Sequence, residues 1–376
     1  MLYHFAFWRN HSVTNTPYPY GAFYGNIFKF GSYGVQFFFI ISGFVISYTL
    51  QTTTSAGAFF KNRFIRLFPP MLLCTLLTYF IAVNWDVNND FMEAHSALNF
   101  LPSLTFIHPR IWSFLVGKHL DWTAFVYWSL WVEVQFYVVA AVIYFRNRKR
   151  FFRNFIVIVV LLNLLNFLLD WLYAGVTKSH SPSSWAHALT LFYNNNRLMY
   201  NIKDYINWFA LGVVFQYLYK KNKIQPLSLT GAGVLFIFVS QFFRCDPPVT
   251  RILYLVMIGF FLCLVYGRNI LFFLDIPLFH RIGVISYTVY LIHDTAGMLL
   301  ITRLGGYLGS LSFLAPFLTI ALVICFAELS YRLYEKNATR LLKRMLFGPK
   351  PPSKELAGAV VAAPQKQEPT QGAGVP

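Results

Sequence analysis

Glu133 is the residue best placed to do chemistry, because it lies inside an apolar stretch that reads WSLWVEVQFY over residues 128–137. A carboxylate is expensive to place in hydrocarbon, so it should face a protein interior and have partners there. Ser129 lies four positions earlier, on the same helical face, with Gln135 and Tyr137 nearby. This group could position a general base or orient a substrate. A purely structural network of hydrogen bonds between helices fits the sequence equally well.

A histidine and a pair of arginines are the next candidates. His4 lies in the apolar segment Met1–Trp8. Neutral imidazole accepts a proton near physiological pH, which suits a general base, and an ordinary histidine at the lipid interface is the alternative. Arg63 and Arg66 lie three positions apart on one helical face. Their guanidiniums could clamp phosphates, or they could simply anchor a helix at the membrane surface.

The stretch ISYTVYLIHD at residues 285–294 carries a further polar group. Ser286 and Tyr290 share a helical face, and Tyr290 neighbours His293 and Asp294 by helical spacing. We do not expect a histidine and an aspartate this deep in an apolar run to face lipid. Core packing around an internal polar pair is the alternative interpretation.

Other polar residues give weaker signals. Glu335 stands next to Lys336, and a solvated ion pair would explain both residues. His108, His119 and Asp121 fall in one loop, but their spacing fits no metal template, so we interpret them as loop residues. The chain has no Gly-Lys-Ser phosphate loop, no GxGxxG, no zinc-ligand spacing and no GxSxG elbow.

The composition indicates a membrane protein. Of the 376 residues, 57% are hydrophobic and only 12% are charged. A soluble protein could not bury this much apolar surface, so several membrane spans are expected. The net charge of +17 would also suit nucleic-acid binding, but the basic residues gather in short loops between apolar runs. That pattern is typical of membrane orientation, and we predict no nucleic-acid partner.

Apolar runs predict nine membrane spans, over Tyr33–Leu50, Leu67–Val83, Val126–Phe145, Phe155–Tyr173, Asp204–Tyr219, Leu227–Phe243, Ile252–Tyr266, Ile282–Thr302 and Leu311–Tyr334. The segment Met1–Trp8 would be the tail of another, which gives about ten. We therefore predict an all-α polytopic membrane protein with about ten transmembrane helices around a polar site. Basic loops alternate with nearly neutral ones, which places both termini in the cytoplasm.

Two segments are expected from this pattern. Residues 1–345 should form one membrane-embedded domain whose first helix is truncated at its N-terminus. Residues 346–376 are rich in Pro, Ala, Gly and Gln and should form a disordered cytoplasmic tail.

Six stretches, in this order, resemble the acyltransferase-3 family of integral membrane acyltransferases. They are YHF at 3–5, GVQFFFIISGFVI at 34–46, RFIRLFPP at 63–70, WSLWVEVQFY at 128–137, ISYTVYLIH at 285–293 and YEKN at 334–337. No single stretch is diagnostic, but the ordered set is specific and covers nearly the whole membrane portion. Gln36 stands where many relatives have an acid, which removes a possible charged partner.

The resemblance implies an enzyme of the bacterial inner (cytoplasmic) membrane. Such enzymes move an acyl group, usually acetyl, from cytoplasmic acyl-CoA to a carbohydrate hydroxyl on the far side. The family's essential histidine falls on His4, its CoA-holding arginine pair on Arg63 and Arg66, and its glutamate on Glu133. Its late serine, tyrosine and histidine positions fall on Ser286, Tyr287 and His293.

These matches give a specific set of predictions. His4 and Glu133 would be catalytic, and Arg63 and Arg66 would bind acyl-CoA. The predicted substrate-binding residues are Ser129, Tyr287, Tyr290, His293 and Glu335. We expect acetyl-CoA as donor substrate, no permanently bound cofactor and no metal. The expected partners are membrane lipid, acyl-CoA, a carbohydrate acceptor and possible glycan-assembly proteins.

Two points stay open from the sequence. His4 could act as a general base or carry the acyl group as a nucleophile. A transporter or flippase for a polysaccharide or lipid-linked sugar, or a membrane scaffold without catalysis, would also contain buried polar residues.

Overall fold

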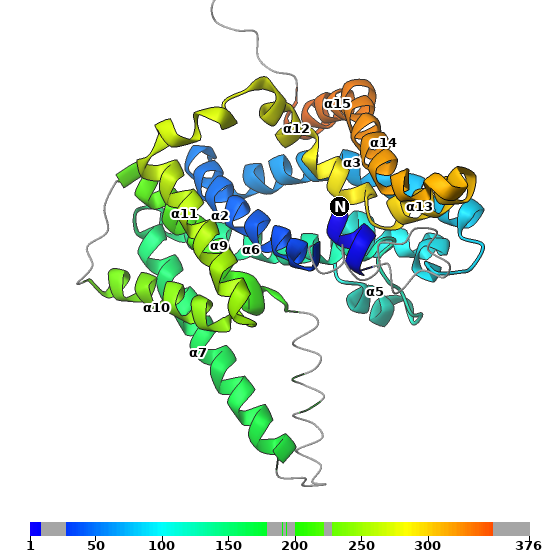
Figure 1. Ribbon diagram of the computed structural model, residues 1–376. Helices are drawn as coiled ribbons and strands as arrows, with labels where there is room; N and C mark the ends of the chain where they lie inside the picture. The colour runs from blue at the N-terminus through cyan, green and yellow to red at the C-terminus, as the bar shows by residue number, and fades with distance from the viewer. Residues whose placement is uncertain (9–27, 179–189, 191–192, 194–199, 222–227, 349–376) are drawn as a thin grey trace, which may run out of the picture.

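The computed structural model describes residues 1–8, 28–178, 190, 193, 200–221 and 228–348 (Figure 1). Most of these residues are helical, and no strand occurs among them. The α-helices are α2 (Gly34–Thr52), α3 (Ala56–Trp85), α4 (Phe100–Thr105), α5 (Pro109–Val116), α6 (Trp128–Arg146), α7 (Phe151–Lys178), α9 (Ile202–Lys221), α10 (Leu229–Arg244), α11 (Pro248–Tyr266), α12 (Pro277–Ile292), α13 (Thr295–Leu308), α14 (Ala315–Ser330) and α15 (Lys336–Phe347). Shorter 3-10 or π segments include η1 (His4–Trp8), η3 (Lys29–Tyr33), η7 (Arg148–Arg150) and η10 (Tyr331–Glu335).

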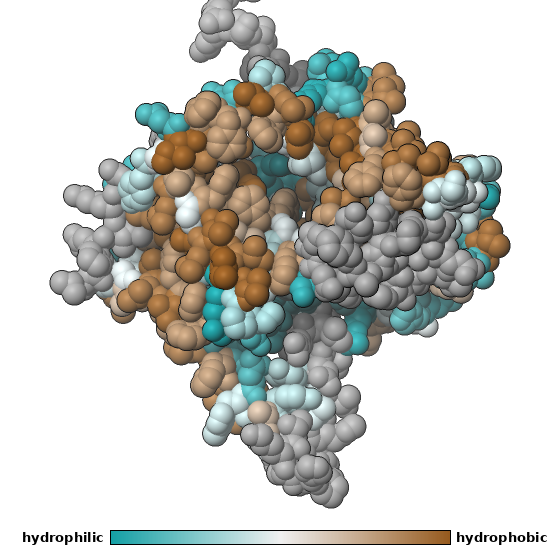
Figure 2. Space-filling model, viewed as in Figure 1, coloured by the Kyte–Doolittle hydropathy of each residue, from teal (hydrophilic) through white to brown (hydrophobic). Residues whose placement is uncertain are grey.

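Several helices could cross a membrane. By length and composition, six stretches of the described chain qualify: Lys29–Thr52, Ala56–Trp85, Phe125–Arg146, Arg148–Gly175, Pro248–Tyr266 and Thr295–Phe347. Hydrophobic residues cover much of the face shown in Figure 2. The all-helical fold and the membrane character are thus confirmed, whereas the count of about ten spans stays a prediction. The predicted disordered tail lies outside the described residues from position 349 onward.

Helix α9 lies inside the bundle and packs closely against α2. Residues 206–216 of α9 are all buried. An added Cβ would lie 2.1 Å from the Phe209 carbonyl oxygen at Gly43, and 2.0 Å from the Ile40 carbonyl oxygen at Gly212. Only glycine fits at either position, so the two backbones approach as closely as small residues allow in membrane helix pairs. This contact fixes the position of α2, whose residues line one wall of the site.

One end of the bundle, which we call the basic end, gathers several helix termini. Lys220 Nζ at the end of α9 donates to Gln51 Oε1 at the end of α2, at 2.6 Å. Arg148 in η7 donates to the carbonyl oxygen of Thr54. Lys61 Nζ at the start of α3 donates to a backbone carbonyl in the last turn of α15, at 3.0 Å. The basic end therefore brings together three basic segments of the sequence, which contain Lys61, Arg148 and Lys220.

The span predicted over Ile282–Thr302 is wrong as a single helix. Helix α12 ends at Ile292, and α13 begins at Thr295. Asp294 stands at the start of α13, yet its side chain does not cap that helix. Its carboxylate instead pairs with His4, far away in the sequence. The break therefore coincides with a tertiary contact that hydropathy cannot reveal.

Candidate active site

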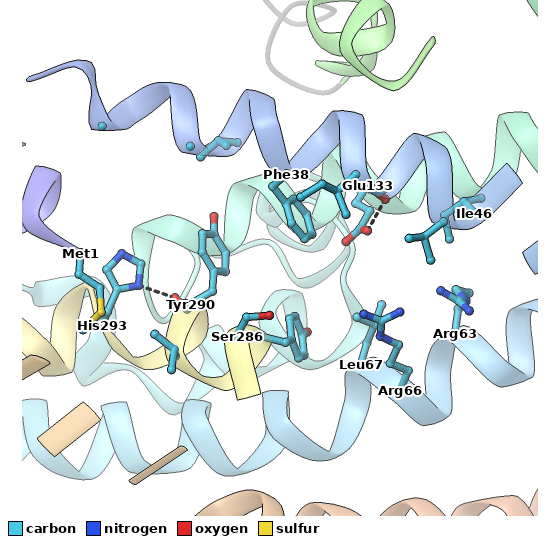
Figure 3. A pocket seen from close by; sticks show the side chains of 18 of the residues that line it. Met1, Phe38, Ile46, Arg63, Arg66, Leu67, Glu133, Ser286, Tyr290 and His293 are labelled. Atoms are coloured by element: carbon cyan, nitrogen blue, oxygen red, sulfur yellow. Dashed lines mark hydrogen bonds between the residues drawn. The ribbon is translucent and has the colours of Figure 1, made fainter. Parts of the chain in front are cut away.

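A cavity of about 370 Å³ lies among α2, α3, α6 and α12. Figure 3 shows His293 at one end of it, Arg63 and Arg66 at the other, and Glu133 in between. His4 lines the cavity next to His293. In Figure 2, hydrophilic residues lie at the bottom of a hollow on an otherwise hydrophobic face. The structure thus brings together four segments that the sequence singled out separately.

The His4 end of the cavity is built around a histidine–carboxylate pair. His4 Nδ1 lies 3.0 Å from Asp294 Oδ1, and Asp294 is fully buried. With its proton on Nδ1, a neutral His4 keeps a lone pair on Nε2. The His293 ring packs edge-on against His4 with 4.8 Å between ring centroids, and His293 Nδ1 lies 2.7 Å from the Tyr290 carbonyl oxygen. His4 therefore has the arrangement that orients a general base.

Glu133 occupies the middle of the cavity wall. Ser42 Oγ on α2 donates to Glu133 Oε1 at 2.6 Å. The glutamate is only 5% exposed, and both residues line the cavity. A hydroxyl from a neighbouring helix is the kind of partner that a carboxylate among apolar helices requires. Glu133 thus contributes to the contact between α2 and α6 and also lines the cavity.

Unused hydrogen-bond donors mark the other half of this cavity. Arg63 Nε is buried and has no hydrogen-bond partner among the described residues, and the same holds for the Tyr287 hydroxyl. The Arg63 guanidinium lies over the Phe59 ring, 5.8 Å from its centroid. A buried polar group left unpaired costs about 1–3 kcal/mol. The cavity is therefore suited to a ligand that brings acceptor oxygens, such as phosphate or a carbonyl.

Ser129 supports the cavity wall from behind. It is not among the lining residues, but Ser129 Oγ lies 2.6 Å from the hydroxyl oxygen of Tyr290, which lines the cavity. Tyr290 also donates to the Val126 carbonyl oxygen at 2.8 Å. These bonds fasten α12 to the residues that lead into α6. Ser129 is thus placed to position Tyr290 rather than to contact a ligand in this cavity.

Glu335 lies away from the cavity. Glu335 Oε1 accepts hydrogen bonds from Thr288 Oγ1 on α12 at 2.7 Å and from Ser330 Oγ at the end of α14 at 2.5 Å. The π-helical segment η10 ends at this residue, which is buried. The carboxylate ties α14 to α12. The structure therefore does not bring Glu335 into the cavity with Tyr287, Tyr290 and His293, which were also predicted to bind substrate.

A second cavity, which we call the distal chamber, has a volume of about 660 Å³. Its walls share His4 and Tyr290 with the first cavity, and it extends away from the arginine pair. His108, His119 and Asp121, interpreted from sequence as loop residues, line it. Burial lowers the pKa of His108, so its imidazole is neutral at pH 7.

Hydrogen bonds hold the loop that contains Asp121 in place. The Asp121 amide donates to Asn99 Oδ1 at 2.9 Å, and the Thr123 amide donates to Ser103 Oγ at 3.0 Å. In the part of the chain that the structure describes, no cluster of three His, Cys, Asp or Glu side chains could hold a metal ion. The loop forms a wall of the chamber.

Two residues of the site were assigned no role from the sequence. Ser42 lies inside the stretch GVQFFFIISGFVI, and Asp294 directly follows ISYTVYLIH. Ser42 therefore lies within a stretch that carries the family resemblance, and Asp294 lies directly beside one. This placement is the signal in the sequence that could have pointed to them. Their contacts join residues 91 and 290 positions apart. No local pattern in the sequence encodes such pairings.

Fold and site together define a helical membrane protein whose cavity connects a carboxylate-paired histidine to two arginines. The family model Acyl_transf_3, described as an acyltransferase domain, matches residues 1–329. The chain belongs to this family, as its six ordered stretches predicted, and is a membrane acyltransferase. No curated protein and no solved structure matches the chain.

Proposed function

We propose that this protein transfers an acyl group, with acetyl as the simplest case, from acyl-CoA to a hydroxyl of a cell-surface or lipid-linked carbohydrate. The proposal places it in the bacterial inner membrane, with the basic end in the cytoplasm. The observation that carries the proposal is one cavity lined by both the His4–Asp294 pair and by Arg63 and Arg66.

The donor enters from the basic end. Arg63 and Arg66 are placed to bind the phosphates of CoA, because guanidinium groups bind phosphate through paired hydrogen bonds. The pantetheine arm then follows the cavity past Glu133 towards His4. The Tyr287 hydroxyl, which has no partner among the described residues, is available to donate to a carbonyl oxygen of the arm or of the thioester.

The transfer follows from the orientation of His4. The acceptor hydroxyl donates its proton to His4 Nε2 while its oxygen attacks the thioester carbonyl carbon. Asp294 stabilises the imidazolium that forms, as a buried carboxylate does in a catalytic triad. When the tetrahedral intermediate collapses, the C–S bond breaks and the imidazolium returns the proton to the thiolate. The products are the O-acyl sugar and CoA with a free thiol.

An acyl-histidine relay competes with direct attack. In the relay, His4 Nε2 itself attacks the thioester and then passes the acyl group to the sugar. Incubating the purified protein with labelled acetyl-CoA and no acceptor distinguishes the two routes. Direct attack predicts no label on the protein, and a labelled His4 would establish the relay.

The proposed function is tested on the cell surface. Proton NMR of the surface glycan should show O-acetyl signals in cells with the wild-type protein and none in cells with His4→Ala at equal protein level. Persistence of those signals in the variant would contradict the proposal. A transporter without acyl transfer gives no role to the unpaired Arg63 Nε and Tyr287 hydroxyl. If His4→Ala instead abolished glycan export and left O-acetylation intact, that result would favour the transporter interpretation.

A further inference from the structure

The distal chamber contains unused hydrogen-bond acceptors. Gln36 Oε1 on α2 and Asn201 Oδ1 just before α9 line it, and both atoms are buried without a hydrogen-bond partner among the described residues. An amide oxygen only accepts hydrogen bonds. Because a buried unpaired acceptor is costly, these positions favour a ligand that brings O–H or N–H donors.

Aromatic side chains form another part of the chamber wall. Trp128 and Tyr205 both line the chamber, and their ring centroids lie 5.4 Å apart at an interplanar angle of 41°. The buried Trp122 lies in the same wall. Binding sites of this kind combine flat apolar surfaces with a few polar groups that set the orientation of the ligand. The C–H face of a sugar ring fits against such rings, while its hydroxyl groups reach the amides.

Among the described residues of the chamber wall, the positive and negative charges are equal in number. Arg110 and Asp121 contribute one charge of each sign to the wall, and His108 is neutral at pH 7 because its pKa is lowered. Gln36, which lines the chamber from α2, is neutral. Among the described residues of the wall, a ligand with a net charge would therefore find no uncompensated partner.

We infer that the distal chamber is the acceptor site and that it selects an uncharged pyranose, whose hydroxyl groups donate to Gln36 and Asn201 while the ring packs on Trp128 and Tyr205. This inference rests on the proposed acyl transfer, because the chamber shares His4 and Tyr290 with the cavity assigned to acyl-CoA. The sugar hydroxyl that lies next to His4 is the one acylated.

Binding to the full chain in lipid nanodiscs tests this inference without requiring turnover. Saturation-transfer difference NMR would use methyl α-D-glucopyranoside and methyl α-D-mannopyranoside as neutral probes, and the methyl glycoside of glucuronate as a charged one. We expect at least one neutral probe to bind better than the glucuronate. Gln36→Ala and Asn201→Ala should each weaken its binding by about 10-fold, whereas Gln36→Glu, which keeps acceptor oxygens, should bind within about threefold of wild type.

Gln51→Ala is the matched control, because Gln51 lies on the same helix at the basic end and bonds to Gln216. It should leave pyranoside binding unchanged. The inference is overturned if no neutral pyranoside binds, if the glucuronate binds best, or if the two amide variants bind as wild type does. Acetyl-CoA binding is measured in the same samples. Its presence without pyranoside binding would reject only this inference, and its absence would reject the proposed function.

Discussion

The two cavities that meet at His4 differ in the hydrogen-bonding groups they leave unused. Towards the basic end, the Arg63 Nε and the Tyr287 hydroxyl are buried donors without partners among the described residues. In the distal chamber, the unpartnered atoms are the amide oxygens of Gln36 and Asn201. The first cavity therefore suits an anionic ligand rich in acceptors, and the second a neutral ligand rich in hydroxyl groups. The proposed function uses this difference by placing the donor and the acceptor substrates on opposite sides of His4.

Removing His4, which lines both cavities, should have the largest effect. His4→Ala should lower kcat/KM for acetyl transfer by about 10²–10⁴-fold. Asp294→Asn should cause a loss that does not exceed the His4→Ala loss, because it leaves the imidazole in place while its amide favours the wrong imidazole tautomer. Transfer of label from acetyl-CoA to a neutral pyranoside by the purified protein measures both.

His95 provides the matched control for these variants, because it pairs with the buried Asp86 at 2.9 Å but lines neither cavity. His95→Gln should keep kcat/KM within about threefold of wild type at equal protein level. An equal loss in the His95 and His4 variants would mean that histidine–aspartate pairs act here through stability alone.

The arginine pair tests the donor side of the comparison. Arg63→Ala and Arg66→Ala should each raise KM for acetyl-CoA by about 10–100-fold, since hydrogen bonds to charged groups contribute about 1.5–3 kcal/mol. Affinity for the pyranoside should not change. Arg340→Ala on α15 is the control for general attraction of anions, because Arg340 is exposed and lines neither cavity. A similar rise in KM for Arg340→Ala would remove the special role of the pair.

The contact of α2 with α9 supports both cavities, because α2 lines the first cavity with Ser42 and the distal chamber with Gln36. Gly43→Ala or Gly212→Ala should destabilise the protein by about 1–3 kcal/mol, the usual cost of overpacking. Thermal unfolding of the solubilised protein would show this as a lower Tm. Gly57→Ala should not lower it, because an added Cβ there meets no atom within 4 Å. Equal Tm values for all three variants would contradict the close packing.

The smallest effect on transfer is expected at Glu335. Glu335→Gln keeps an acceptor for Thr288 and Ser330 and touches neither cavity. It should change kcat/KM by less than about threefold, whereas Glu133→Gln should lower kcat/KM by about tenfold or more, because a hydrogen bond to a charged group contributes about 1.5–3 kcal/mol. A larger loss at Glu335 than at Glu133 would restore the sequence-based prediction that Glu335 binds substrate.

Much of the fold could be predicted because it depends on local pattern. Apolar runs predicted the spans now seen in α2, α3, α6, α7 and α11, and the spacing of Arg63 and Arg66 placed both on one helical face. The break at His293 and Asp294 could not be predicted, because the apolar run continues through it and the contact that Asp294 makes there comes from the distant His4.

The distal chamber could not be predicted for a similar reason. His108, His119 and Asp121 match no template by themselves, and they acquire meaning only beside residues from α2 and α9, such as Gln36 and Tyr205. Pairings between distant segments are a property of the folded chain.

A structure of the protein bound to an unreactive acetyl-CoA analogue tests the central claim most directly. The account predicts CoA phosphates in contact with Arg63 and Arg66, and the analogue's acyl carbonyl carbon within about 4–6 Å of His4 Nε2, which leaves room for one hydroxyl between them. A CoA bound away from the arginine pair, or an acyl group that does not reach the cavity end at His4, would contradict it.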